Sequence, residues 1–467
     1  MNVPRLDRTV HPYIPSSVPA VRAAMLLQIG VSDVEELYAV IPPELRLARP
    51  LNLPPAFRSE QELRRHVEGL LARNTSAADY LSFLGAGCYQ HYVPAVCDEI
   101  NGRSEFLTAY GGEPYEDHGR FQALFEYCSQ MGELLAMDVV SVPTYDGAQA
   151  TGTALRMAGR LTGRRTALVP RTMSAQRRSA VANYVDPVLD LVEVGYDPAS
   201  GLLDLADLRS KLSSGVAAVL LENPNHLGVI EEGAAEIVSL AHAHGALAVA
   251  AVDPSSLGVL EAPGNYGVDI ACGDLQTLGI HMYFGGGHGG FIASRDEPSI
   301  VGEYPSRLFG MTTTKVAGEY GFGDVMWERT SFHDREHGKE FVGTAAALWG
   351  ITAGVYLALM GPLGMQELGT TWIQLGRYAA GRLSAVAGVR APALTGTPLK
   401  EFVVDFSRTG RTVAEINTAL LARGIFGGTD LSREFPELGQ AALYCVTEVH
   451  SREDIDRLVS AVAEVVS

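Results

Sequence analysis

Residues 246–279 read ALAVAAVDPSSLGVLEAPGNYGVDIACGDLQTLG and contain two short apolar runs. Neither run alternates apolar with polar residues, so we predict two strands that are buried on both faces. Asp253 ends the first of them. Similar runs alternate with helical stretches through residues 120–294, namely TALVP, DLVEVGY, VAAVLLEN and GGFIAS. This alternation predicts an α/β domain whose mainly parallel sheet is covered by helices on both sides.

Two regions flank this block. Residues 1–75 carry helical patterns interrupted by prolines, which predicts an N-terminal arm of helices and extended chain. Residues 331–467 contain a long apolar helix, two short strand patterns, and two helices that begin at Thr412-x-x-Glu415 and Ser451-x-x-Asp454. We therefore expect a large α/β domain over 76–330 and a small α+β domain with an antiparallel sheet over 331–467.

Composition excludes several classes of function. Acidic residues outnumber basic ones by 54 to 36, giving a net charge of −18, so nucleic acid is not an expected partner. The five cysteines show no CxxC spacing, and we expect neither a disulfide framework nor a metal site. The N-terminus lacks an apolar signal region and no apolar run reaches membrane-spanning length, so we expect a cytoplasmic protein without a membrane span.

The positions of Asp253 and Gln276 indicate a cofactor fold with one residue changed. Domains of this layout that bind pyridoxal phosphate use a strand-end aspartate for the pyridinium nitrogen, and a lysine one strand later for the imine. Asp253 fits the first role, but Gln276 stands where the lysine would be and cannot form an imine. The alternative is that Asp253 only caps its strand.

Two glycine-containing segments are further candidates. In TYDGAQATG, Gly147 and Ala148 precede a helical pattern, an arrangement in which backbone amides accept a phosphate. An ordinary helix start explains the same pattern equally well. GGGHGG at 285–290 matches a dinucleotide motif, but it precedes a strand instead of opening a helix. We expect its glycines to let a loop pass close to other backbone.

The segment YGGEPYEDHGR, residues 110–120, concentrates side chains that can transfer protons or bind a charged substrate. A solvated surface loop is the alternative. A second polar segment, FHDREHGKEF at 332–341, precedes the long apolar helix. The candidate catalytic residues are those of the first segment, namely Tyr110, Glu113, Tyr115, Glu116, Asp117 and His118.

Ordered motifs over more than 400 residues resemble one family. Residues 13–57, which begin YIPSSVPAVRAAM, resemble the start of subunit 1 of the two-subunit bacterial glycine decarboxylase P-protein. The motifs FLGAGCYQHYVPAV, YDGA, ENPN, YLALMGPLGM, RGIFGG and ALYCVTE follow in the family's order. The resemblance implies an aminotransferase-like fold of the type I pyridoxal-phosphate enzymes.

The resemblance also implies an assembly. In this family only the other subunit carries the lysine, and subunit 1 typically has glutamine at the position of Gln276. The implied partner is a homologous lysine-bearing subunit in an αβ or α2β2 complex, with an amino-acid substrate and a lipoyl carrier protein as further partners. Pyridoxal phosphate would be held covalently by the partner subunit and contacted from this chain, with Lys339 and Thr344 as additional contacts.

Departures from the family pattern leave the reaction open. The family typically reads YTPYQPE where this chain has YGGEPYEDHG, and a Ser-Asn run where it has REHGKEFVGT. Because these segments are expected to approach the cofactor, we favour altered chemistry, such as carbon–carbon bond formation or elimination in specialised biosynthesis. The alternatives are genuine glycine decarboxylation, and a non-catalytic regulatory or scaffold subunit. A free-standing enzyme without the lysine is disfavoured because it would lose its internal imine.

Overall fold

A computed structural model gives the fold and describes residues 10, 11, 13–47, 49, 51–106, 118–340, 342 and 346–467. The chain forms two units, Met1–Asn74 and Thr75–Ser467. The first contains helices α1 (Pro19–Ile29) and α2 (Glu60–Leu71) with short 3-10 turns. Neither helix buries a residue, although α1 is rich in alanine and leucine.

The second unit is built on a seven-stranded sheet in the order β2-β8-β7-β6-β5-β3-β4. Strands β3 to β7 run parallel, whereas β8 pairs antiparallel with both β7 and β2. A mainly parallel sheet was the sequence prediction, and the structure has it. The bounds are β2 (Val139–Val140), β3 (Thr166–Pro170), β4 (Asp190–Val194), β5 (Val216–Asn223), β6 (Leu247–Val252), β7 (Ile270–Asp274) and β8 (Gly290–Ser294).

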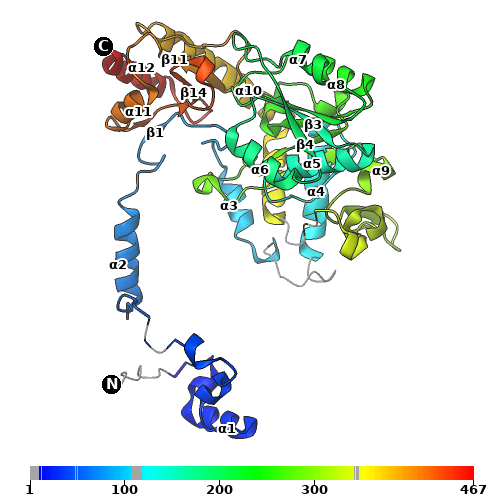
Figure 1. Cartoon of the computed structure of the whole chain (residues 1–467), viewed down its shortest axis with the longest axis vertical. Helices are drawn as coiled ribbons and strands as arrows, with labels where there is room; N and C mark the ends of the chain where they lie inside the picture. The colour runs from blue at the N-terminus through cyan, green and yellow to red at the C-terminus, as the bar shows by residue number, and fades with distance from the viewer. Residues whose placement is uncertain are drawn as a thin grey trace. The chain divides into compact units, whose positions relative to one another are not determined.

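Helices cover both faces of this sheet (Figure 1). Side chains alternate between the faces along each strand. Thus Leu220 of β5 packs with the cluster around α5 (Gly147–Thr162), while Leu221 packs with the cluster around α8 (Ala234–Ala243). The other helices of this part are α3 (Ala95–Asn101), α4 (His118–Leu135), α6 (Ala175–Val185), α7 (Leu205–Lys211) and α9 (Pro298–Val301), and a hairpin of β9 (Phe309–Thr313) and β10 (Tyr320–Asp324) follows.

The C-terminal part has its own sheet of three antiparallel strands in the order β11-β14-β13, as the strand patterns predicted. Both predicted capping boxes form, one at Thr412 and one at Ser451. Figure 1 shows α11 and α12 grouped with this sheet at one end of the unit. The bounds are β11 (Glu401–Asp405), α11 (Val413–Leu421), β12 (Ile425–Phe426), β13 (Thr429–Asp430), β14 (Ala441–Cys445) and α12 (Arg452–Val466).

Helix α10 (Ala347–Ser384) joins the two sheets. It is long and apolar enough to cross a membrane by length and composition, a test that the core helix of a compact domain also passes. Here Tyr356 belongs to the core of the large sheet and Leu383 to that of the small one, and Pro362 interrupts the helix between them. The helix therefore serves as a core element in this fold.

A segment before α3 links the same two regions. Strand β1 (Leu81–Ser82) pairs in parallel with β12, and residues 85–91 then run to the carboxyl ends of β6 and β7. Glu401 at the start of β11 accepts a hydrogen bond from the Ala86 amide at 2.7 Å. This segment therefore brings groups of the small sheet to the edge of the large one.

Candidate functional site

A pocket of about 70 Å³ lies at the carboxyl ends of β3, β5, β6 and β7, and its lining includes Ser174, Arg177, Glu222, His226, Asp253 and Gln276. The carboxyl edge of a parallel sheet is where α/β folds bind ligands, because loops from neighbouring strands converge there. The sequence predicted that Asp253 and Gln276 follow neighbouring strands, which puts them at this edge. It did not predict which residues they bond to.

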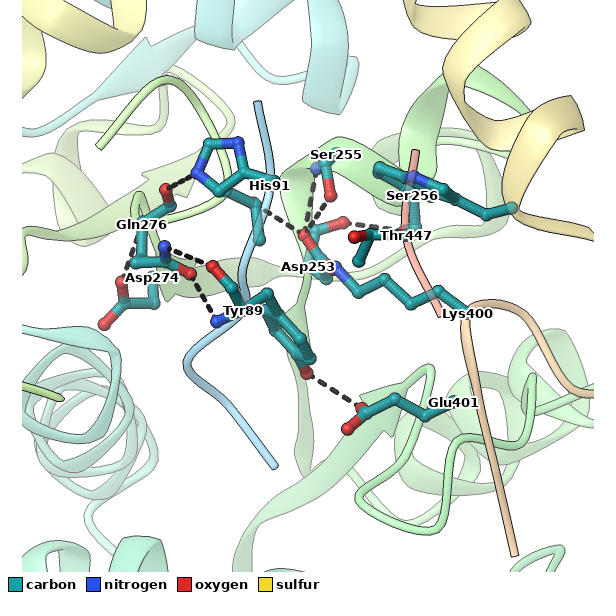
Figure 2. Close-up of polar contacts among 12 residues, drawn as sticks. Tyr89, His91, Asp253, Ser255, Ser256, Asp274, Gln276, Lys400, Glu401 and Thr447 are labelled. Carbon is teal, nitrogen blue, oxygen red and sulfur yellow. Dashed lines mark hydrogen bonds and ion pairs between the residues drawn. The ribbon is translucent and has the colours of Figure 1, made fainter. Parts of the chain in front are cut away.

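Asp253 follows β6 and is bound by Lys400, which precedes β11. The ammonium of Lys400 donates to Oδ2 of Asp253, and the hydroxyl of Ser255 donates to Oδ1 at 2.6 Å (Figure 2). The hydroxyl of Thr277 also donates to Oδ1, at 2.8 Å. Burial by itself raises the pKa of Asp253, but the charge and hydrogen bond of Lys400 outweigh it, so the net shift is downward. Asp253 is therefore a carboxylate whose charge is already compensated within the chain.

Lys400 is held from several sides. It is buried, and its Nζ lies 3.7 Å from the centre of the Tyr89 ring and 4.9 Å from that of Trp372. Aromatic faces attract cations, most strongly where water is excluded. The chain has only four lysines, at positions 211, 315, 339 and 400. A lysine directly before the apolar strand EFVVDF was the one sequence signal for this residue.

Gln276 uses its side-chain amide to fix residues 89–91 in place. Its Oε1 accepts from the Tyr89 amide at 2.9 Å, and its Nε2 donates to the carbonyls of Tyr89 and Ile280 at 2.9 and 3.0 Å. The side chain is 1% exposed. In Figure 2, Tyr89 lies between Gln276 and Glu401, to which its hydroxyl donates at 2.9 Å. Gln276 thus stabilises the fold, since both of its amide hydrogens are used.

The start of α5, where Gly147 and Ala148 were candidates for phosphate binding, is capped by this chain's own carboxylates. The Gly147 amide donates to Oδ2 of Asp274 at 3.0 Å, and the Gln149 amide donates to Oδ1 of Asp146 at 2.8 Å. A helix N-terminus attracts anions through such amides. Two aspartates already fill that role here.

Asp274 also contacts a second cluster. Its Oδ1 lies 3.5 Å from Nδ1 of His288, and Nε2 of His288 lies 3.7 Å from the thiol of Cys88. Burial lowers the pKa of His288, but its bonds to Asp274 and Cys88 outweigh this and raise it to about 10. His288 belongs to GGGHGG, where a Cβ on Gly290 would lie 2.1 Å from the Asp146 carbonyl oxygen. This close approach agrees with the interpretation for Gly290, whereas a Cβ on Gly285 or Gly287 would meet nothing within 4 Å.

Arg177 and Glu222 form a third cluster, which the sequence did not single out. Nη1 of Arg177 donates to Oε1 of Glu222 at 2.5 Å. Glu222 is buried, whereas 30% of the Arg177 side chain is exposed. His226 lines the same pocket, and burial together with Arg177 lowers its pKa to about 4.

The remaining sequence candidates lie elsewhere. Tyr110, Glu113, Tyr115, Glu116, Asp117 and Thr344 fall outside the described residues, and His118 is described only as the first residue of α4. Lys339 lies away from the pocket lining. Its ammonium contacts Glu303 at 2.5 Å, and Glu303 also pairs with Arg160. The structure therefore unites Asp253, Gln276 and Gly147 but does not bring Lys339 to them.

Comparison with known proteins identifies the family to which this fold and site belong. The sequence profile of the glycine cleavage system P-protein matches residues 11–462. The chain belongs to the glycine cleavage system P-protein family. A probable glycine dehydrogenase (decarboxylating) subunit 1 from Carboxydothermus hydrogenoformans is 41% identical over 451 residues, which cover 96% of this chain and 98% of that protein. The corresponding protein from Staphylothermus marinus is 37% identical, with 98% of each chain covered.

Solved structures show the same relationship. A glycine decarboxylase P-protein in inhibitor-bound form superposes with a TM-score of 0.85 at 33% identity, covering 98% of this chain and 100% of that one. A NifS-like protein from Rickettsia africae superposes at 0.62 with 13% identity, which shows the fold alone. The predicted type I fold is confirmed. Family and fold are those of pyridoxal-phosphate enzymes.

Pyridoxal phosphate does not fit this chain's own pocket in the way that the fold would hold it. The aspartate is bound to Lys400, the lysine position carries a hydrogen-bonded glutamine, and the Gly147 amide is bound by Asp274. Each of the three contacts that the cofactor needs is already made within the protein.

Proposed function

We propose that this chain is the lysine-free subunit of a two-subunit glycine decarboxylase, which completes an active site built mainly by a homologous lysine-bearing subunit. The observation that carries the proposal is the Lys400–Asp253 pair beside the hydrogen-bonded Gln276, since together they leave no place for the cofactor here. Pyridoxal phosphate on the partner supplies the electron sink for the reaction. This chain's own residues would position the substrate and exclude water.

Glycine is the proposed substrate. The sequence favoured altered chemistry because two loops depart from the family pattern, but the relatives named above span nearly the whole chain and are named for glycine decarboxylation. Their similarity supports the alternative over the altered reaction. A lipoyl carrier protein is then the proposed acceptor of the aminomethyl group.

The absorption spectrum tests where the cofactor is bound. The chain purified alone with added pyridoxal phosphate should lack the band of lysine-bound cofactor near about 420 nm, because it offers no lysine at position 276. Co-expression with the lysine-bearing homologue should produce that band. A band from this chain alone would contradict the proposal.

Activity of the reconstituted pair tests the reaction. Release of CO₂ from carboxyl-labelled glycine should require both subunits and a lipoylated carrier protein. Full release by the lysine-bearing subunit alone would make this chain a regulatory or scaffold subunit. Turnover of another amino acid in place of glycine would restore the altered chemistry.

We propose that the polar segment around residues 110–118 reaches the shared site, together with Lys339 and Thr344. Glu116→Ala or His118→Ala should lower turnover at least about tenfold without preventing assembly, because a general acid or base contributes on the order of 10²–10⁴ to rate. Glu367→Ala, at an exposed position of α10, is the matched control. Unchanged turnover in both variants would favour the alternative interpretation, in which the segment is a solvated surface loop.

The exposed apolar side chains of the N-terminal unit favour a protein partner. Its large apolar side chains are exposed to an unusual degree, including Leu27 at 81%, Val40 at 88% and Tyr13 at 96%. Exposed apolar clusters of this kind mark interaction surfaces. We propose that this arm packs on the lysine-bearing subunit in an αβ or α2β2 complex, whose stoichiometry light scattering of the co-expressed pair would give.

A further inference from the structure

The pocket at the sheet edge contains one buried polar atom that has no hydrogen-bond partner among the described residues. Oε2 of Glu222 is buried and has no hydrogen-bond partner among the described residues. A buried carboxylate oxygen without a donor is costly, and native proteins usually satisfy it with a ligand or ordered water. Because Glu222 lines the pocket, a bound molecule can supply that donor.

Hydrogen-bond donors lie beside this acceptor oxygen of Glu222. A guanidinium has five N–H donors in a planar fork that matches a carboxylate. Within the described chain, Arg177 uses Nη1 for Glu222, and 30% of its side chain stays exposed. His226 also lines the pocket and, with its pKa near 4, is neutral at physiological pH, so one ring nitrogen can donate. These donors suit an anionic group next to the acceptor on Glu222.

Charge balance restricts the net charge of the ligand. Each carboxylate that lines the pocket already has a cationic partner: Glu222 has Arg177, Asp253 has Lys400, and Asp274 has His288. A ligand with a net charge would leave one charge uncompensated in a partly buried site, which is costly. A ligand with one positive and one negative end preserves the balance.

The size of the pocket suits a small ligand. Its volume of about 70 Å³ has room for several water-sized positions, taking ~10–15 Å³ for each, so a molecule of about five non-hydrogen atoms fits.

We propose that this pocket binds a small zwitterionic amino acid, with its carboxylate on Arg177 and His226 and its ammonium on Oε2 of Glu222. The inference rests on the proposed function in one respect, namely that this chain does not hold the cofactor in its own pocket. It gives the pocket a ligand that is bound separately from the shared active site.

Calorimetric titration of the full chain, purified without its partner, tests this with glycine as the probe. We expect saturable binding of one glycine per chain. Arg177→Gln and Glu222→Gln should each weaken it at least about tenfold, because charge-assisted hydrogen bonds are lost, and Glu222→Gln does so with nearly unchanged side-chain size. Arg178→Gln is the matched control, since Arg178 is the next residue of α6 but pairs with Glu193 and does not line the pocket.

Two further probes separate the ends of the ligand. Acetate lacks the ammonium and N,N,N-trimethylglycine lacks N–H donors, so neither should bind at concentrations that saturate with glycine. Equal binding of acetate would show an anion site and overturn the inference, as would absence of glycine binding to the unaltered chain. Circular dichroism spectra establish that each variant is folded, and the nearly isosteric Glu222→Gln keeps the test valid if Arg177→Gln fails to fold.

Failure of this inference is distinguishable from failure of the proposed function. If the isolated chain does not bind glycine while the two-subunit complex releases CO₂ from it, only the inference is wrong. If the isolated chain binds glycine and the complex is inactive, the pocket stands and the proposed reaction is wrong.

Discussion

Two clusters of charged residues at the same edge of the sheet differ in whether their polar atoms are all hydrogen-bonded. In the lysine cluster, formed by Tyr89, Asp253, Gln276 and Lys400, both amide hydrogens of Gln276 and both carboxylate oxygens of Asp253 are bonded within the chain. In the arginine cluster, formed by Arg177, Glu222 and His226, one buried carboxylate oxygen has no partner among the described residues. The first cluster is arranged as part of the core, and the second as a place where something binds.

The largest expected effect is in the lysine cluster. Lys400→Met should destabilise the chain by about 3–5 kcal/mol, because it leaves the buried Asp253 charge uncompensated. Urea unfolding measures the change. The double variant Asp253→Asn with Lys400→Met should recover most of the loss, since it removes both charges.

Lys211→Met is the matched control for that loss. Lys211 forms a half-exposed i,i+4 pair with Asp207, so its removal should cost about 1 kcal/mol or less. Equal costs for the two lysine variants would mean that the lysine cluster is not a buried core pair, and the comparison of the two clusters would fail.

Restoring a lysine should not restore a cofactor. Gln276→Lys removes the acceptor for the Tyr89 amide and adds a second buried ammonium near Lys400, so we expect a loss of about 2–3 kcal/mol. The variant mixed with pyridoxal phosphate should still show no band near about 420 nm. A band would mean that the glutamine at position 276 is the only obstacle to cofactor binding in this pocket. Lys400 and Asp274 would then leave room for the cofactor.

A smaller effect is expected from Arg177→Gln. Because 30% of the Arg177 side chain is exposed, water can reach Glu222 when the guanidinium is removed, and the loss should be about 1–2 kcal/mol. Thermal and urea unfolding without added ligand measure it, with Arg178→Gln as the control. A loss as large as that of Lys400→Met would place both clusters in the core.

The smallest effect is a difference in acid sensitivity. The pKa of Asp253 is lower in the folded chain than its ordinary value, so its contribution is present above about pH 4 and is lost as pH falls through the folded pKa. One such group changes the slope by at most about 1.4 kcal/mol per pH unit. Urea midpoints between about pH 5 and 3 should fall more steeply for the unaltered chain than for the Asp253→Asn, Lys400→Met variant. Parallel curves would show that Lys400 does not stabilise the Asp253 charge.

Much of the fold follows from local patterns. The unbroken apolar runs of β5, β6 and β7 predict strands buried on both faces, and Thr412 and Ser451 mark helix starts that the structure has. These features depend on neighbours within a few residues, so the sequence shows them directly. The family resemblance added the type I fold, which the comparisons confirm.

The site was predicted only in part. Asp253 and Gln276 were found because each is defined by its position after a strand. Arg177 and Glu222 carried no recognisable motif, since an arginine in a helix and a glutamate ending a strand are ordinary in sequence. Lys339 lies with Glu303 and not in this chain's own pocket, and its predicted contact with a cofactor held by the partner subunit stays a prediction.

The sequence by itself determined that position 276 carries an amide that cannot form an imine. It also determined that Asp253 ends the earlier of the two apolar runs that precede this position. Only the tertiary structure decided what those residues do. Lys400 is 147 residues from Asp253, and Tyr89 is 187 residues from Gln276. Such pairs form only when the small sheet and the segment before α3 pack against the edge of the large sheet. Local propensities cannot encode them, because the energy comes from burying charges and amides together across separate elements.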